Sequence, residues 1–154
     1  MTRPSLHSLL ERVRSAEKGS DLLDAQIRCC LWAPYDAVIE QSRINGKFCI
    51  YVPTASGGVK WWERPRSVPQ DLWLGSYSTS LDAAVSLIEK ELPGWAWEVG
   101  MNHGDGSQAT LLRDGDGPDD YAVIEERLPA PPAISLLAAL LSAKLSMEED
   151  NAEA

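Results

Sequence analysis

The sequence has few of the residues on which catalysis and disulfide bonding usually depend. It contains three cysteines and two histidines. Cys29 and Cys30 are adjacent, so the cysteines have neither the spacing of a disulfide framework nor that of a metal site, and such a set is typical of a reducing compartment. Cys49, His7 and His103 fall in separate predicted elements, and no nucleophile, base and orienting group come together. We therefore expect a protein that is not an enzyme and that uses no cofactor or metal.

Two further absences concern membranes and nucleic acids. The longest apolar run, near residues 133–145, is interrupted by Ser135, Ser142 and Lys144 and is too short to span a bilayer, and no signal-peptide pattern precedes the first helix. The formal net charge of -9 opposes binding to duplex nucleic acid, because such binding draws its affinity from neutralised phosphates. We expect an acidic, cytoplasmic protein with neither a membrane nor a nucleic acid duplex as its partner.

The most informative stretch present is residues 77–100. Its apolar residues recur at helical spacing, which predicts an amphipathic helix capped by Thr79 or Ser80; they are Leu81, Ala84, Val85, Ile88 and Leu92. Pro93 and Gly94 end this helix, since proline cannot continue it and glycine takes the left-handed turn. Trp95, Trp97 and Val99 then alternate with smaller or charged residues, as in a half-buried strand. The helix is therefore expected to fold back directly onto a sheet.

The remaining patterns predict an α+β fold. Two helices, at residues 5–18 and 20–33, form a hairpin, and strands at 38–44 and 48–52 flank an Asn45-Gly46 turn. Three strands follow the central helix, at residues 95–101, 108–113 and 121–127. A last helix covers residues 133–147. Strands joined by short links form an antiparallel meander. We expect one domain over residues 1–147, with the hairpin and a tryptophan-rich loop inserted at 35–75 and a flexible acidic tail at 148–154.

Two segments resemble the phage and prophage proteins grouped as the phage ABA sandwich domain. They are YSTSLDAAVSLIEKELPGWAWEVG and LPAPPAISLLAALLSAKL, and the matching positions are Tyr77, Ser80, Leu81, Asp82, Ala83, Ala84, Pro93, Gly94, Trp95 and the helix at 131–145. The chain departs from the family pattern at residues 78–79 and 92–94, and residues 35–75 do not align with it. The resemblance implies an α-β-α sandwich with helices on both faces of the sheet and a phage origin. It implies no catalytic residues, because the shared positions are caps, turns and core.

One stretch interleaves basic and aromatic side chains and is the candidate ligand site. It comprises Lys60, Trp61, Trp62, Arg64 and Arg66. This composition is typical of surfaces that stack bases or bind phosphorylated ligands. The alternative is that the tryptophans cover the sheet while the charges are solvated.

An acidic turn imitates a calcium-binding loop. Asp114, Asp116, Asp120 and Glu125 occupy the first, third, seventh and twelfth positions of such a loop. The match fails because Pro118 stands at the fifth position, Asp119 replaces the required glycine, and the flanks read as strands. A solvated turn that binds no metal is the prediction.

The last helix has more apolar surface than one sheet can cover. Its small residues Ser135, Ala139, Ser142 and Ser146 recur at steps of three and four, which lets another helix approach closely. That helix is either the first helix of the same chain or the same helix of a second copy, which would give a homodimer.

The leading functional hypothesis is a phage or prophage accessory protein that acts by non-catalytic binding to a host or phage protein, for example in counter-defence. The alternative is a small-ligand or nucleotide-binding protein that uses Trp61 and Trp62. A small hydrolase is a remote third hypothesis.

Overall fold

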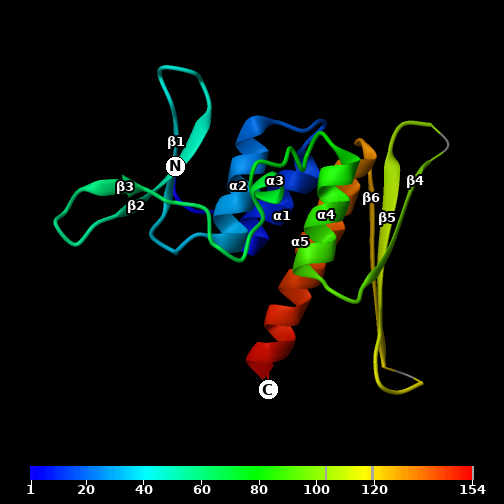
Figure 1. Cartoon of the computed structure of the whole chain (residues 1–154). Helices are drawn as coiled ribbons and strands as arrows, with labels where there is room; N and C mark the ends of the chain where they lie inside the picture. The colour runs from blue at the N-terminus through cyan, green and yellow to red at the C-terminus, as the bar shows by residue number, and fades with distance from the viewer. Residues whose placement is uncertain (103, 119, 154) are drawn as a thin grey trace.

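The computed structural model describes residues 1–102, 104–118 and 120–153. Figure 1 shows three layers, in which a small sheet and a longer one lie on opposite sides of the helices. The small sheet contains β1 (Val38–Gln41), β2 (Phe48–Pro53) and β3 (Val59–Trp61). The helices are α1 (Leu6–Ser15), α2 (Asp21–Trp32), α3 (Gln70–Trp73), α4 (Leu81–Glu91) and α5 (Pro132–Glu153). The longer sheet contains β4 (Ala96–Met101), β5 (Ser107–Asp114) and β6 (Tyr121–Leu128).

The α+β class and the antiparallel meander are confirmed. Both sheets are antiparallel, with the strand orders β1-β2-β3 and β4-β5-β6. Helices on both faces of the meander were predicted, whereas α5 covers one face and the described residues of the other face are exposed or half-buried. The outer face of β4-β5-β6 tolerates water because Leu112 and Val123 there alternate with polar residues.

Helix α5 is the centre of the core. Residues 133–141 are all buried, since α1 packs against one side of the helix and β5 and β6 against another. Helices α1, α2 and α4 begin where serine caps them: Ser5, Ser20 and Ser80 each accept a hydrogen bond from a first-turn amide. Burial on several sides explains why the α5 sequence is apolar all round.

The predicted dimer interface on α5 is wrong for its first two residues. Ser135 and Ala139 are fully buried within the chain, and the Ser135 Oγ lies 2.7 Å from the Ser107 Oγ of β5. Ser142 is half-buried and Ser146 is exposed. The alternative, that α1 of the same chain covers α5, is confirmed.

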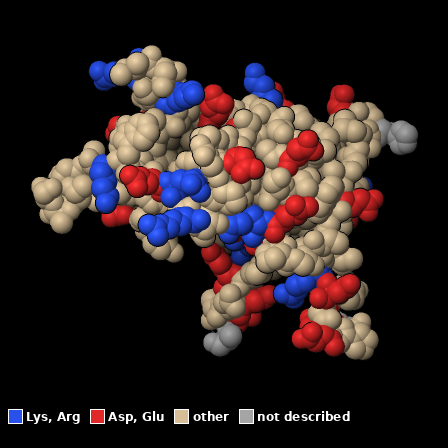
Figure 2. Space-filling view, in the orientation of Figure 1, with Lys and Arg blue, Asp and Glu red and all other residues tan. Residues whose placement is uncertain are grey.

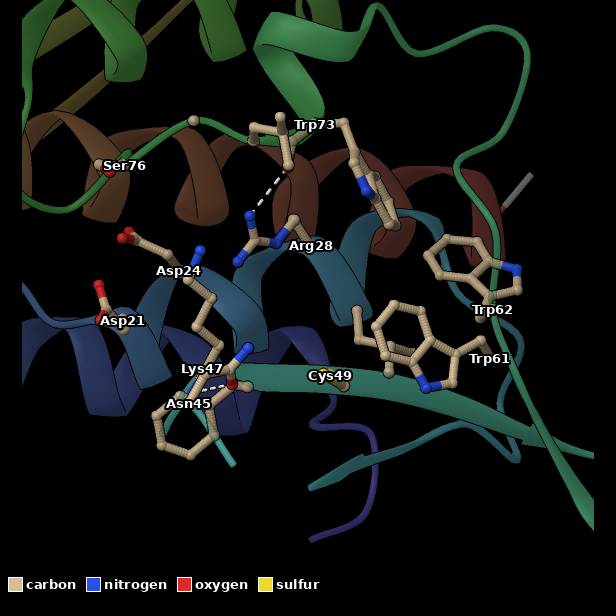
Figure 3. Close-up of a pocket in the computed structure, with 14 residues that line it drawn as sticks. Asp21, Asp24, Arg28, Asn45, Lys47, Cys49, Trp61, Trp62, Trp73 and Ser76 are labelled. Carbon is tan, nitrogen blue, oxygen red and sulfur yellow. Dashed lines mark hydrogen bonds between the residues drawn. The ribbon is translucent and has the colours of Figure 1, made fainter. Parts of the chain in front are cut away.

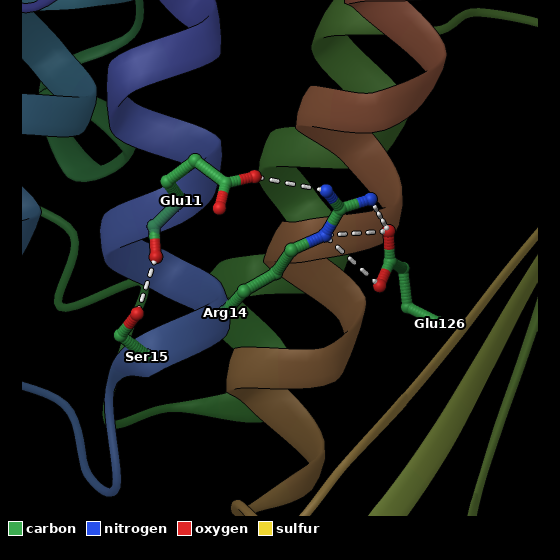
Figure 4. Close-up of polar contacts among 4 residues, drawn as sticks. All are labelled: Glu11, Arg14, Ser15 and Glu126. Atoms are coloured by element: carbon green, nitrogen blue, oxygen red, sulfur yellow. Dashed lines mark hydrogen bonds and ion pairs between the residues drawn. The ribbon is translucent and has the colours of Figure 1, made fainter.

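An ion pair fastens α1 to the longer sheet (Figure 4). The Arg14 Nη2 lies 2.7 Å from the Glu126 Oε1 on the inner face of β6, and the Arg14 Nη1 lies 3.1 Å from Glu11. The bond to Glu126 raises the pKa of Arg14 further. The carboxylate of Glu126, which is buried on this inner face, therefore has the guanidinium of Arg14 as its counter-ion.

Three local predictions need correction. Helix α5 continues to Glu153, so the acidic residues predicted as a flexible tail are helical; glutamates are good helix formers and no proline or glycine stops them. The β1–β2 loop spans residues 42–47 rather than two residues, with Gly46 at a φ of 70°. The 35–75 segment also contains β3 and α3, which were not predicted.

The strand after Gly94 has the predicted phase but less burial. Gly94 has a φ of 85°, as expected for a left-handed helix stop. Trp97 pairs with Leu111 on the inner face, yet it is exposed because β4 is an edge strand. Trp95 is half-buried, with the Arg113 guanidinium 5.6 Å from its ring centroid. Across the described residues no helix is both long and apolar enough to cross a membrane.

Candidate binding cleft

A cleft of about 410 Å³ lies between α2, the edge of β2 and β3, and the chain that follows α3. Its aromatic end contains Trp61, Trp62 and Trp73, and Figure 3 shows Asp21, Asp24 and Lys47 toward the other end. We call it the tryptophan cleft. Its size is that of a ligand pocket, and its lining combines apolar surface with a few polar groups.

One face of α2 supplies the polar wall. Asp21, Asp24 and Arg28 follow at steps of three and four residues, which places them on the same side of the helix. Arg28 Nη1 donates to the Trp73 carbonyl at 2.8 Å, and Asp24 Oδ1 accepts the Ser78 N–H at 2.8 Å. These two bonds hold the chain from α3 to α4 over α2 and so define the roof of the cleft.

The tryptophans come from two places in the sequence. Trp62 and Trp73 meet edge to face, with ring centroids 5.1 Å apart, and Trp32 of α2 lies 6.0 Å from Trp73. Trp62 is half-buried against the cluster beneath the small sheet, whereas Trp61 is 65% exposed at the rim. Trp62 therefore has a packing role, while Trp61 leaves apolar surface free.

The structure brings together part of the predicted ligand site. Trp61 and Trp62 line the cleft, but Lys60, Arg64 and Arg66 are not among its lining residues. Lys60 and Arg66 are exposed, and Arg64 donates to the carbonyl of Val68.

The cations of the cleft are instead Arg28 and Lys47, from α2 and the β1–β2 loop. Sequence reasoning missed them because they are distant from Trp61 along the chain. The sequence did contain one signal that α2 contributes to a site. Some of its polar residues, such as Asp24, stand at positions that the apolar neighbours predict to be buried.

Asp24 is the cleft's most perturbed acid. It is 3% exposed, and its burial raises the pKa of its carboxyl above the ordinary value. The hydrogen bond from Ser78 and the charge of Arg28 act in the opposite direction without cancelling the effect. The folded protein therefore binds a proton here more tightly than the unfolded chain does.

We expect Asp24→Asn to reduce the pH dependence of stability. Because the folded pKa is raised, the contribution of Asp24 to the free energy of unfolding is greatest below the unfolded pKa of about 4 and is lost as pH rises through the folded pKa. Asparagine keeps an acceptor for the Ser78 N–H but does not titrate. Urea denaturation at several pH values should show the variant gaining stability relative to wild type as pH rises. Asp21→Asn, at an exposed position, is the matched control. If the difference in the free energy of unfolding between Asp24→Asn and the wild type did not change with pH, the assignment would be contradicted.

The other candidate sites show no binding geometry. In the acidic turn, Asp116 N–H donates to Asp120 Oδ2 at 3.2 Å, and Glu125 pairs with Arg127. Asp119 lies outside the described residues. No group of three His, Cys, Asp or Glu residues that could hold a metal occurs among residues 1–102, 104–118 and 120–153.

The described thiols differ in burial. Cys29 and Cys30 are buried, and burial raises the pKa of Cys29 to about 11. Cys49 lines the cleft and is half-buried. His7 is exposed on α1, and His103 lies outside the described residues.

The surface charge is uneven. Figure 2 shows several Lys and Arg side chains near the middle of the face viewed, with Asp and Glu spread over the face and also at its lower end. The net charge of -9 is thus an average over distinct regions, and the cleft itself contains both signs.

Comparisons with protein-family models, with curated proteins and with solved structures found no match. The resemblance to the phage ABA sandwich domain therefore stays a prediction. Function has to be inferred from the cleft itself.

Proposed function

We propose that the protein acts by non-catalytic binding and that the tryptophan cleft is its binding site. The observation that carries the proposal is the exposed Trp61 beside a half-buried Trp62–Trp73 pair, with Arg28 next to them. Tryptophan and arginine are the residues most enriched at binding hot spots, and exposed aromatic surface beside a concave site favours a ligand that covers it.

The partner we propose is a protein of a phage or of its host, bound by an accessory protein of phage or prophage origin. The family resemblance supports this origin, and a cleft lined by aromatic, apolar and charged side chains supports a segment of polypeptide as the ligand. A nucleotide is the second candidate, since Arg28 and Lys47 supply cations to a cleft that also contains indole rings. Asp21 and Asp24 line the same cleft and disfavour a phosphate there, so the polypeptide is preferred.

Catalysis is not proposed because the cleft lacks an activated nucleophile. Cys49 is the thiol that lines it, and within the described chain no hydrogen bond joins this thiol to a base. Asp24 binds the backbone N–H of Ser78 rather than a catalytic partner.

Replacing Trp61 with alanine should weaken binding strongly while leaving the fold intact. The probes are linear peptides selected from a random displayed library on the immobilised full chain, together with a panel of nucleotides. Because Trp61 is exposed, we expect a change in stability of about 0.5 kcal/mol or less. We expect a loss of affinity of about tenfold or more, as for a hot-spot aromatic. Fluorescence anisotropy measures affinity, and thermal unfolding measures stability.

The matched control is Tyr121→Ala, since Tyr121 is 63% exposed on the other sheet. Its affinity for the same peptide should equal that of the wild type. Peptides that bind Trp61→Ala as tightly as the wild type, or a wild type that binds neither peptides nor nucleotides, would contradict the proposed function.

A further inference from the structure

The central strand of the small sheet has an open edge on the cleft side. β2 pairs with β1 from residue 48 to residue 51, whereas β3 pairs with residues 51–53. Beyond that point the chain leaves the sheet at Trp62, whose N–H donates to the Ile50 carbonyl at 2.9 Å. Phe48, Cys49 and Ile50 line the cleft. On the side where the cleft opens, β2 is therefore unpaired before Ile50.

The alternation of the ladder fixes which backbone groups face this edge. Ile50 directs its carbonyl to Trp62, so Phe48, two residues earlier, directs its N–H and carbonyl to the same side. The residue between Phe48 and Ile50 directs its backbone groups to the other side of β2, where Cys49 lies opposite Glu40 of β1. Phe48 lies opposite Gln41 at a non-hydrogen-bonded position of the β1–β2 ladder, so β1 does not take up its N–H. The edge thus presents a donor and an acceptor with the spacing that another strand requires.

We propose that an extended peptide segment of a partner protein adds a strand to β2 at residues 48–50, with a bulky apolar side chain seated among Trp61, Trp62 and Trp73. This inference rests on the proposed function and specifies its mode. An unpaired strand edge is completed by main-chain hydrogen bonds from an extended peptide, while pockets beside it select alternate side chains. The tryptophan end of the cleft provides such a pocket next to the edge (Figure 3).

The charges of the cleft also suit a peptide. Asp21 and Asp24 lie with Lys47 and Arg28 along the same cleft, so both signs are available to a segment that carries polar side chains beside its apolar anchor. A polyanion would meet the carboxylates, whereas a peptide backbone is neutral. The hydrogen bonds at the edge do not depend on the sequence of the peptide, and the tryptophans supply the selectivity.

An N-methyl scan of the peptide tests the mode directly. One peptide selected on the full chain is synthesised with each backbone nitrogen methylated in turn, and the affinity of every version is measured by fluorescence anisotropy. Methylation removes a donor and adds bulk at that position. We expect a loss of about tenfold or more at the one position whose N–H donates to the Phe48 carbonyl, with the two adjacent positions as internal controls. A single position is expected because a strand directs every second N–H to its neighbour and the Ile50 carbonyl is already bonded to Trp62.

The possible results separate the inference from the function on which it rests. Losses spread equally over all positions, or no loss at any position, would overturn strand addition; if Trp61→Ala still weakened binding, the cleft would remain the binding site. A wild type that binds a nucleotide at the cleft but no peptide would also overturn strand addition. Peptides that bind with equal affinity to wild type and Trp61→Ala would overturn both proposals. A loss of affinity at one methylated position with its neighbours unaffected, together with weaker binding to Trp61→Ala, supports both.

Discussion

Leu137→Ala is expected to lower the free energy of unfolding by about 2–5 kcal/mol. Leu137 is fully buried in the middle of α5, within the core cluster that joins α1, α4 and the inner face of the longer sheet. Removing its side chain leaves a cavity that elements on several sides of α5 would have to close. Since small domains are stable by about 5–15 kcal/mol, the loss would be a large part of the total. Urea denaturation measures it.

Met147→Ala on the same helix is the matched control. Met147 is 37% exposed near the end of α5, and alanine favours helix at least as strongly as methionine. We expect its effect to be about 1 kcal/mol or less. An equal loss for the two substitutions would contradict the central position assigned to α5.

Gly19→Ala is expected to cost about 1–3 kcal/mol or more. A Cβ at this position would lie 2.2 Å from the backbone carbonyl oxygen of Ser78, a contact that a rotamer change cannot relieve. The adjacent Ser20 N–H donates to Ser78 Oγ at 3.0 Å, and Asp24 accepts the Ser78 N–H. The substitution would therefore displace the chain that forms the roof of the tryptophan cleft, and peptide affinity should fall with stability.

Gly100→Ala separates this contact from the general effect of replacing glycine. Among the described residues no atom lies within 4 Å of a Cβ built at Gly100, and its φ is not positive. Chemical denaturation of both variants should show a clear loss for Gly19→Ala and a small change in either direction for Gly100→Ala. Two variants of equal stability would show that the close packing of Gly19 on Ser78 is unimportant.

The elements that could be predicted from the sequence are those fixed by nearby residues. Serine caps, the Gly94 stop and the helical spacing before it depend on contacts a few residues apart, and the structure has them. The layer order could not be predicted in this way. α2 packs against the small sheet through one face and against the main core through another, and this depends on contacts between distant segments.

The candidate site was predicted in part for the same reason. The stretch at residues 60–66 was interpreted as one continuous surface, but a strand directs successive side chains to opposite faces. Lys60 pairs with Val52 and Trp61 with Tyr51, so neighbours in the sequence separate in space. Arg28 and Asp24 reach the same cleft from α2, and only the tertiary fold brings them there.

The claim that the tryptophan cleft is the binding site is tested most directly by an NMR titration of the ¹⁵N-labelled full chain with a selected peptide. We predict that the largest changes in chemical shift occur at the amides of residues 48–50, at Arg28 and at the indole N–H groups of Trp61, Trp62 and Trp73. Changes confined to the outer face of β4-β5-β6, around Tyr121 and Val123, with the cleft signals unmoved, would contradict the claim.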